Sequence, residues 1–396
     1  MDLMQEHDDD LNRKVILLSV GSAAAAALLV ALARRRDDEG VGARAEEIAA
    51  RAGDAVADAK QESKKAAKAA KKKPKGRIVR PRPGSARKRA VPAAPPTLND
   101  PLWASSWSLA KANAPAAWQL TTGSPETIVA VLDTGADLHH PDLAGAFVPG
   151  YDFVHHDEDA SDDHGHGTMV TGVIAARANN GIGGAGACSR CSVMPIKVIA
   201  ADGSGNARDV ALGIVWAADH GARVINLSFV LSGPDDGVTS AIGYAQARGA
   251  VVVAAAGNAG SSEITFPAGI PGVVSVTGTD GADVRYSWAN YGSWVRFAAP
   301  GCSQATAPAG GYGEFCGTSS AAAFVSGLVG LARSLAADAP ADAISAQLAA
   351  HAVPVGGFVS AGRVDAAATL GAFRPAQAQL APAAASAQPA AAQGLD

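Results

Sequence analysis

The stretch TIVAVL, residues Thr127–Leu132, decides the fold class, because it is a continuous apolar and β-branched run that stops at Asp133. A short run without polar alternation is typical of a strand that is buried on both faces of a parallel sheet. Similar runs recur along the chain, at Ser192–Val198, Arg223–Leu227, Ala250–Ala255 and Val273–Thr277. The recurrence predicts a sheet of several buried, parallel strands.

Candidate helices alternate with these strands. Ala-rich stretches with helical character span His166–Ala178, Ala207–His220 and Thr239–Arg248. Alternating strands and helices predict an α/β fold in three layers, a mostly parallel sheet with helices on both faces. Active sites in such sheets gather at the carboxyl ends of the strands, so the residues that follow each strand are the first candidates for chemistry.

The globular domain is expected to span residues 97–373 of the 396-residue chain. Residues 37–96 are rich in Ala, Lys and Pro and hold too few large apolar side chains for a core, which predicts a disordered basic linker or an atypical propeptide. Residues 374–396, rich in Ala, Pro and Gln, are predicted to be a disordered tail. The basic tract could contact anionic lipid or another polyanion, or serve as a solvated spacer.

The N-terminal segment 1–36 contains the uncharged run 15–33, which has basic residues on both sides. A run of this length can just span a bilayer as a helix. Ala31-Leu32-Ala33 also matches the small-x-small pattern of a signal-peptide cleavage site. A buried core helix fits the terminal position and the flanking charges poorly. We therefore expect an extracytoplasmic protein, secreted or anchored in a membrane by this segment.

Two residues at the ends of predicted elements suggest acid–base chemistry. Asp133 follows the first strand, where a buried carboxylate is costly unless it is hydrogen-bonded. His166 begins a predicted helix and could act as a general base near neutral pH. Each also has a plain structural explanation, because Asp133 could cap a turn and His166 could, with His164, bind a metal.

Two further residues suggest a nucleophile and a stabilising donor. Ser319 precedes the Ala-rich helix Ala321–Leu335, where a hydroxyl can cap the helix or react beside its positive end. Asn258 follows the strand Ala250–Ala255 and could point its amide into a cleft or form a turn. The four residues occur in the order Asp, His, Asn, Ser, which is one of the orders in which a Ser-His-Asp triad occurs.

Six ordered motifs extend this pattern. They are Val-Leu-Asp-Thr-Gly (131–135), Gly-His-Gly-Thr (165–168), Ile-Asn-Leu-Ser (225–228), Ala-Ala-Ala-Gly-Asn (254–258), Ala-Pro-Gly (299–301) and Gly-Thr-Ser-Ser-Ala (317–321). Through them the chain resembles the subtilases, subtilisin-like serine proteases of the thermitase and subtilisin type, from about Thr97 to Phe373. The resemblance implies an endopeptidase in which Ser319 attacks the scissile carbonyl, His166 is the base, Asp133 orients it and Asn258 donates to the oxyanion.

The resemblance also implies how a substrate is bound. Subtilases lay a peptide as an added strand between two extended edges, and recognition through main-chain hydrogen bonds tolerates many sequences. We therefore expect protein or peptide substrates of varied sequence. We also expect the enzyme to act as a monomer. The candidate substrate-binding residues are Gly203, Ser204, Gly205, Ser228, Phe229, Ala255 and Gly257.

A structural Ca²⁺ ion and no organic cofactor are further implications of the resemblance. Asp142 and Asn180 would offer side-chain oxygens, Ile182 a backbone carbonyl, and Asp100 would complete the site. Hard oxygen ligands of this kind suit Ca²⁺.

The four cysteines fit two disulfide bonds in an exported domain. Cys188 and Cys191 form a C-x-x-C that could instead be a redox pair or half of a zinc site. The pairing of Cys302 with Cys316 is a hypothesis, and such a bond would lock the loop just before Ser319.

Three departures from the family pattern lie near the expected site. Met169 stands where subtilases usually have His, Ala323 stands where they usually have Pro, and Phe229-Val230-Leu231 replaces Leu-Gly-Gly. The last change puts bulk beside the pocket for a substrate side chain. The alternative function is therefore a catalytically silent binding or scaffold protein, tethered through the basic segment. A basic-tract protein that binds polyanions is a further alternative.

Overall fold

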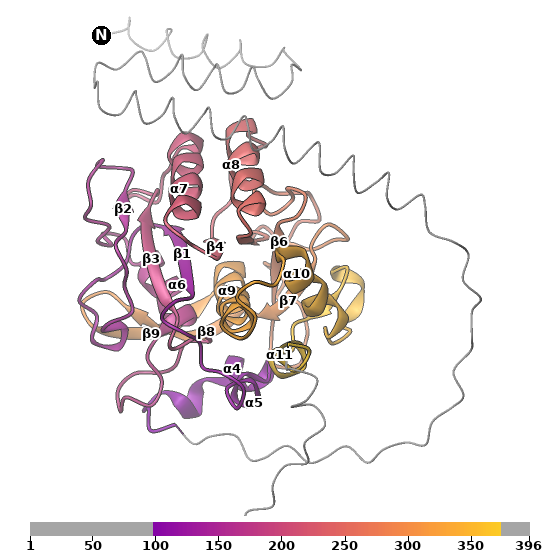
Figure 1. Cartoon of the computed structure of the whole chain (residues 1–396). Coiled ribbons are helices and arrows are strands. Elements are labelled where there is room, and N and C mark those ends of the chain that lie inside the picture. The colour runs from indigo at the N-terminus through magenta and orange to yellow at the C-terminus, as the bar shows by residue number, and fades with distance from the viewer. Residues whose placement is uncertain (1–97, 374–396) are drawn as a thin grey trace, which may run out of the picture.

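The computed structural model describes residues 98–373, which form an eight-stranded sheet, a two-stranded hairpin and surrounding helices (Figure 1). The strand order in the large sheet is β10-β7-β6-β5-β4-β1-β3-β2, and all its pairings are parallel. Its strands are β1 (Ile128–Asp133), β2 (Tyr151–Asp152), β3 (Ser192–Lys197), β4 (Val224–Leu227), β5 (Val251–Ala255), β6 (Val274–Thr279), β7 (Phe297–Pro300) and β10 (Gly362–Arg363). The antiparallel hairpin consists of β8 (Cys302–Ala307) and β9 (Gly311–Cys316).

All five predicted strands are present, with ends shifted by one or two residues, as β1, β3, β4, β5 and β6. The prediction missed β2 and β10, which are two residues each and too short to carry a pattern. It also missed β7 and the hairpin β8–β9. The predicted α/β class with a mostly parallel sheet is confirmed.

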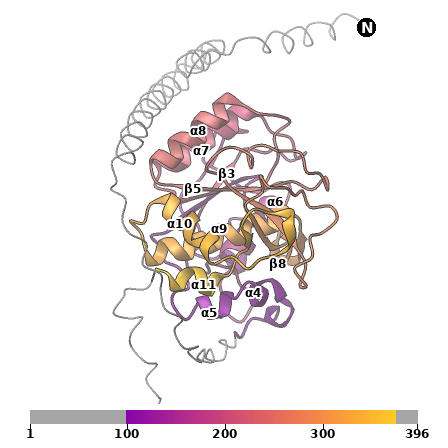
Figure 2. The same ribbon diagram turned by 90° about the vertical axis from the view of Figure 1, so that its right-hand side faces the viewer.

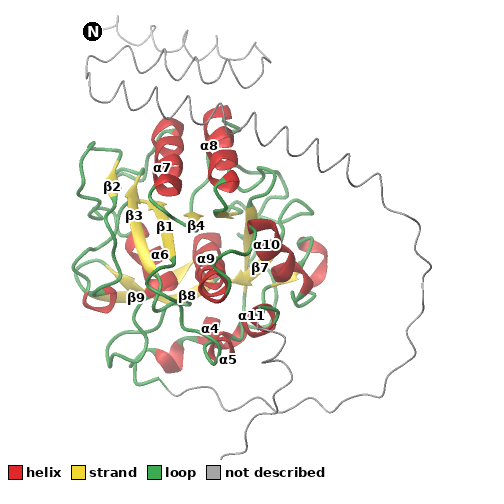
Figure 3. Ribbon diagram, viewed as in Figure 1, coloured by secondary structure: helices red, strands yellow, loops and turns green. Residues whose placement is uncertain are grey.

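Helices cover both faces of the sheet (Figures 2 and 3). On one face lie α7 (Ala207–Asp219) and α8 (Asp236–Ala247), and on the other lie α6 (His166–Ala175), α9 (Thr318–Leu335) and α10 (Ala341–Ala350). The shorter helical segments are η1 (Trp103–Ser105), α4 (Trp107–Lys111), α5 (Ala114–Ala117), η2 (Pro141–Leu143), η3 (Gly356–Phe358) and α11 (Ala366–Gly371).

The residues of β1 explain why this strand lies inside the molecule. Successive side chains of a strand point to opposite faces. Val131 joins the core that contains Val325 of α9, whereas Leu132 joins the core that contains Ile214 of α7. Each fully buried Val or Leu stabilises the fold by about 1.5–3 kcal/mol. A polar residue at either position would therefore face an apolar core, and β1 would lose the packing that places Asp133.

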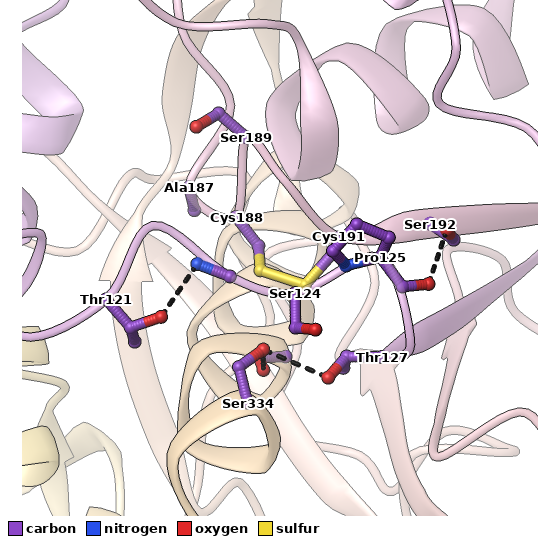
Figure 4. Close-up of a disulfide and its surroundings, with 12 residues drawn as sticks. Thr121, Ser124, Pro125, Thr127, Ala187, Cys188, Ser189, Cys191, Ser192 and Ser334 are labelled. Carbon is purple, nitrogen blue, oxygen red and sulfur yellow. Dashed lines mark hydrogen bonds between the residues drawn. A yellow bond between two sulfur atoms is a disulfide. The ribbon is translucent and has the colours of Figure 1, made fainter.

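Helix α9 is buried almost along its whole length and packs closely on its neighbours. A Cβ on Gly330 would lie 3.0 Å from the sulfur of Cys191, so glycine is needed where the helix meets the Cys188–Cys191 disulfide (Figure 4). Below the disulfide, Thr127 and Ser334 share a hydrogen bond of 2.9 Å between their hydroxyls. Through these contacts the C-terminal half of α9 packs against the Cys188–Cys191 disulfide and is hydrogen-bonded to the residue just before β1.

Candidate active site

The carboxyl ends of β1, β4 and β5 are adjacent in the sheet, and a candidate residue lies at or shortly after each of them. Asp133 is the last residue of β1, Ser228 directly follows β4, and Asn258 lies shortly after β5. Parallel pairing puts these three ends at one edge of the sheet. The N-terminus of α6 supplies His166 and the first turn of α9 supplies Ser319.

Asp133 and His166 form a direct hydrogen bond. The Nδ1–H of His166 donates to Oδ1 of Asp133 over 2.7 Å, and the backbone N–H of Thr134 donates to the same oxygen over 2.8 Å. Asp133 is fully buried. With Nδ1 bonded to Asp133, Nε2 of His166 is left as the acceptor, which is the tautomer that a general base needs.

The backbone of α6 approaches the end of β1 very closely. A Cβ on Gly167 would lie 2.0 Å from the carbonyl oxygen of Gly135 and 3.2 Å from Cβ of Asp133. Any other residue at position 167 would force the helix away from the strand. Glycine is therefore the residue that permits the hydrogen bond between His166 and Asp133.

The pKa of His166 reflects opposing influences. Burial lowers the pKa of His166, but the charge and hydrogen bond of Asp133 and the charge of Asp162 outweigh burial, so the pKa lies above its ordinary value. The Phe315 ring from β9 also packs against the imidazole, with the two ring planes 80° apart and the ring centroids 5.3 Å apart. The imidazole is thus held from the β1 side and from the hairpin side.

Ser319 lies in the first turn of α9 and is nearly buried. Its Oγ donates to the carbonyl oxygen of Ser228 over 3.0 Å. Beneath it, Asn226 donates to Ser228 Oγ over 2.9 Å and accepts from Ser326 Oγ over 2.8 Å. This buried polar network joins β4 to α9 and fixes the position of the serine backbone relative to the sheet.

Asn258 is exposed, and its orientation is fixed by one neighbour. Its Oδ1 accepts from the backbone N–H of Thr318 over 2.9 Å and from the Thr318 hydroxyl over 3.0 Å. The Thr318 hydroxyl accepts in turn from the Gly257 N–H over 3.0 Å. Because Oδ1 is occupied by two donors, the amide N–H₂ of Asn258 is left to donate elsewhere.

Five of the seven candidate substrate-binding residues occupy two segments, and the other two lie at the end of β5 and just after it. Gly203, Ser204 and Gly205 are exposed, and Gly205 pairs with Ile199 in an isolated antiparallel bridge. The second segment runs from Ser228 through Phe229, which is half-buried, to Leu231, whose N–H donates to the carbonyl of Phe266 over 2.7 Å.

Ala255 and Gly257 border the second segment. Ala255 is buried at the end of β5. A Cβ on Gly257 would lie 3.2 Å from Cγ2 of Val230, so the exposed Val230 side chain leans over Gly257.

The structure brings together the four candidate calcium residues. Asp100 and Asp142 are both buried, and Asn180 Nδ2 donates to Asp142 Oδ1 over 2.7 Å. The backbone N–H of Asn180 donates to Asp100 over 3.0 Å, and the N–H of Ile182 donates to Asn180 Oδ1 over 3.1 Å. Burial raises the pKa of Asp142 above its ordinary value, and the charge of Asp100 adds to this rise. Two buried carboxylates thus lie close to the Asn180 amide, whose nitrogen faces Asp142 and whose oxygen accepts from Ile182.

All four cysteines are in disulfide bonds. Cys188 and Cys191 are fully buried. Cys302 and Cys316 are opposite each other at the open end of the β8–β9 hairpin, and Cys316 is exposed. The second bond closes the hairpin two residues before Thr318. The predicted pairing of Cys302 with Cys316 is therefore confirmed.

Sequence reasoning missed two residues that touch this site. Phe315 packs on His166, and Asp162 accepts hydrogen bonds from Gly165, which precedes His166, and from Thr168, two residues after it. Phe315 lies in the hairpin that the sequence did not reveal. Asp162 lies in an acidic loop in which the sequence does not distinguish one aspartate from the next.

Within the described part of the chain, no helix combines the length and the apolar character needed to cross a membrane. The run 15–33, the basic segment 37–96 and the tail 374–396 lie outside the described residues, and so do the predictions made for them.

Comparison with known proteins places this fold in a family. The subtilase family matches residues 124–377. Thermitase of Thermoactinomyces vulgaris is 42% identical over 237 residues, which are 59% of this chain and 85% of thermitase. A thermophilic serine proteinase of a Bacillus species is 43% identical over 216 residues, 54% of each chain.

A solved structure is also similar. A protease from Pseudoalteromonas arctica has a TM-score of 0.65 and 32% sequence identity, and the match covers 70% of this chain and all of that one. With the family match over most of its length, the chain belongs to the subtilase family and is a serine endopeptidase of the subtilisin type.

Proposed function

We propose that the chain cleaves peptide bonds through Asp133, His166 and Ser319, with Asn258 as an oxyanion donor. The observation that carries this proposal is the 2.7 Å hydrogen bond between His166 Nδ1 and the buried carboxylate of Asp133. That bond fixes the tautomer in which His166 can accept a proton at Nε2. It is formed beside helix α9, whose first turn contains Ser319.

In the first half of the reaction, Ser319 Oγ attacks the scissile carbonyl and His166 Nε2 takes the hydroxyl proton. The developing oxyanion accepts hydrogen bonds from Asn258 Nδ2 and from the Ser319 N–H at the positive end of α9. His166 then gives the proton to the leaving amine, and an acyl-enzyme remains. Water, activated by the same histidine, hydrolyses the acyl-enzyme in the second half.

The substrate is proposed to lie as an extended strand between two segments. One segment is Gly203, Ser204 and Gly205, and the other begins with Ser228 and Phe229. Main-chain hydrogen bonds from such edges bind proteins and peptides of varied sequence. Ala255 and Gly257 would line the space for the substrate side chain next to the cleaved bond.

Calcium is proposed as a structural ion held by Asp100, Asp142, Asn180 and the carbonyl of Ile182. The residues fit this ion, because two buried carboxylates of like charge lie close to the amide side chain of Asn180 and burial raises the pKa of Asp142. A bound Ca²⁺ would supply the positive charge that this pair needs.

The remaining parts of the chain complete the proposal. Residues 97–373 would be the catalytic domain, and the run 15–33 a signal or membrane anchor that places the domain outside the cytoplasm. The basic segment 37–96 would be a linker or atypical propeptide that can contact polyanions, and 374–396 a tail. The enzyme would act as a monomer.

Labelling with a fluorophosphonate tests the catalytic proposal. The wild-type chain, loaded with calcium, should be labelled at Ser319 and should hydrolyse a denatured protein substrate, whereas Ser319→Ala should do neither. A correctly folded wild type that takes no label would favour the alternative of a catalytically silent binding protein.

A further inference from the structure

Asp133 ends β1 and His166 begins α6, and the loop that leads into α6 contributes to their relative position. Asp162 lies in this loop, four residues before His166, and is half-buried. It makes no hydrogen bond to either residue. It bonds instead to the neighbours of both.

One oxygen of Asp162 forms hydrogen bonds both to the residue after β1 and to the residues just before α6. Oδ1 accepts from the Thr134 hydroxyl over 2.8 Å, from the His164 N–H over 3.0 Å and from the Gly165 N–H over 2.8 Å. Thr134 is the residue after Asp133, and Gly165 is the residue before His166. A single oxygen thus contacts both sides of the Asp133–His166 pair.

The other oxygen of Asp162 binds the first turn of α6. Oδ2 accepts from the backbone N–H of Thr168 over 2.8 Å and from the Thr168 hydroxyl. The Thr134 hydroxyl, which donates to Asp162, also accepts from the Gly167 N–H over 2.9 Å. Hydrogen bonds therefore connect Thr134 to Asp162 and Asp162 to Thr168. Along the chain, Thr134 follows Asp133 and Thr168 lies two residues after His166.

Five donors on one carboxylate indicate an ionised group. Although burial acts to raise it, hydrogen bonds from Thr168, Gly165, His164 and Thr134 hold the pKa of Asp162 below its ordinary value. At neutral pH the group is thus a fixed negative charge and a fixed acceptor. Its charge also acts on the imidazole of His166.

We propose that Asp162 is a positioning residue of the triad: by holding Thr134 and Thr168 with one carboxylate, it sets the geometry of the His166–Asp133 hydrogen bond. This inference rests on the proposed function. Displacement of a catalytic group by about 1 Å can cost on the order of 10²-fold in rate. The effect should therefore appear in kcat, because Asp162 touches no segment assigned to the substrate.

The test compares Asp162→Asn with Asp159→Asn, which removes the same charge from an exposed position of the same loop. Asp162→Asn keeps an acceptor at Oδ1 but turns Oδ2 into a donor that faces the donors of Thr168. We expect its kcat to fall at least about 10-fold with KM nearly unchanged. We also expect the acid limb of kcat/KM against pH to move to lower pH, because a charge that raises the pKa of His166 is lost. Asp159→Asn should match the wild type.

A second pair of variants separates position from charge. Thr134→Val removes the hydroxyl that links Asp162 to Gly167, whereas Thr134→Ser keeps it, and the carboxylate stays charged in both. Thr134→Val should lower kcat without moving the acid limb, and Thr134→Ser should restore kcat. If Asp162→Asn moves only the acid limb, or if the two Thr134 variants behave alike, the inference is wrong. Should Asp162→Asn fail to fold, the Thr134 pair decides.

The His166 Nδ1 proton gives a readout that needs no activity. In a Ser319→Ala background, its NMR signal should keep the downfield position of a hydrogen bond to Asp133 in Asp159→Asn and Thr134→Ser. It should shift upfield in Thr134→Val and Asp162→Asn. An unchanged signal in all four would overturn the inference, while an inactive wild type with these shifts would refute only the proposed function.

Discussion

The Oγ of Ser319 donates its hydrogen bond to the backbone carbonyl of Ser228, over 3.0 Å. Among the described contacts there is no hydrogen bond between this hydroxyl and His166. The hydroxyl must therefore leave this carbonyl before His166 can take its proton. A peptide strand that pairs with the Ser228 edge would offer an N–H to the same carbonyl and so release the hydroxyl.

We expect Ser319→Ala to leave the pKa of His166 unchanged in the enzyme without substrate, because no hydrogen bond joins the two side chains there. An NMR titration of the imidazole measures this directly. Asp133→Asn serves as the comparison, since it removes the charge that raises this pKa. A rise in the pKa on Ser319→Ala would mean that the hydroxyl already donates to Nε2, because such a bond favours the neutral imidazole.

Activity should fall as the pH drops through the pKa of His166, because the base must be neutral to accept a proton. Since the pKa in the folded enzyme lies above its ordinary value of 6.5, the acid limb of kcat/KM should have its midpoint above pH 6.5. The raised pKa also means that protonated His166 stabilises the fold below the unfolded pKa, and that this contribution is lost as the pH rises through the folded pKa. A pH–rate profile with a midpoint below 6.5 would contradict the geometry.

Asn258→Ala should lower kcat by about 10²–10³-fold, the range found for the loss of such a donor in subtilisin, a relative of this chain. KM should change little, because the amide donates to a charge that exists only in the transition state. Steady-state kinetics on a peptide anilide measures both constants. A large rise in KM with kcat intact would assign Asn258 to substrate binding instead.

Removal of calcium with a chelator should lower the Tm of the wild type by about 5 °C or more, since a tightly bound ion contributes a few kcal/mol to stability. Asp142→Asn should have a low Tm that no longer responds to the chelator. Asp338→Asn, which changes an exposed carboxylate far from the site, should respond as the wild type does. Equal responses of the two variants would remove Asp142 from the site.

A mild dithiol reductant should open Cys302–Cys316 before Cys188–Cys191, because Cys316 is exposed whereas the other pair is fully buried. Alkylation followed by mass mapping identifies the opened bond. Activity should decline with this first reduction, since the hairpin that holds Phe315 on His166 loses its closure. Full activity with Cys302 and Cys316 alkylated would show that the strand pairing alone holds the hairpin.

The central strands and the four candidate residues, which lie at strand ends and helix starts, could be predicted because each signal is local. A buried run such as Thr127–Leu132 needs no knowledge of its neighbours, and Asp133 is visible as the polar residue where it stops. The short edge strands β2 and β10 carry no such pattern, since two residues cannot show a period.

The supports of the site could not be predicted, because their roles arise only when distant segments meet. Asp162 is one of several acidic residues in its loop, and only the folded chain shows that it accepts hydrogen bonds from Thr134 and Thr168. Phe315 contacts His166 from a hairpin whose sequence resembles a loop. The rotamer of Ser319 likewise depends on the Ser228 carbonyl.

The position of β1 in the sheet has a consequence for how activity arises during folding. Val129 pairs with Val193 on one side and with Val224 on the other, so β1 is completed only by strands far along the chain. Non-local pairing of this kind forms slowly, because loop closure must precede it. Asp133 acquires its buried surroundings only when both pairings are formed. Under the proposed function, a half-folded chain therefore lacks an assembled triad and cannot yet digest its equally unfolded neighbours.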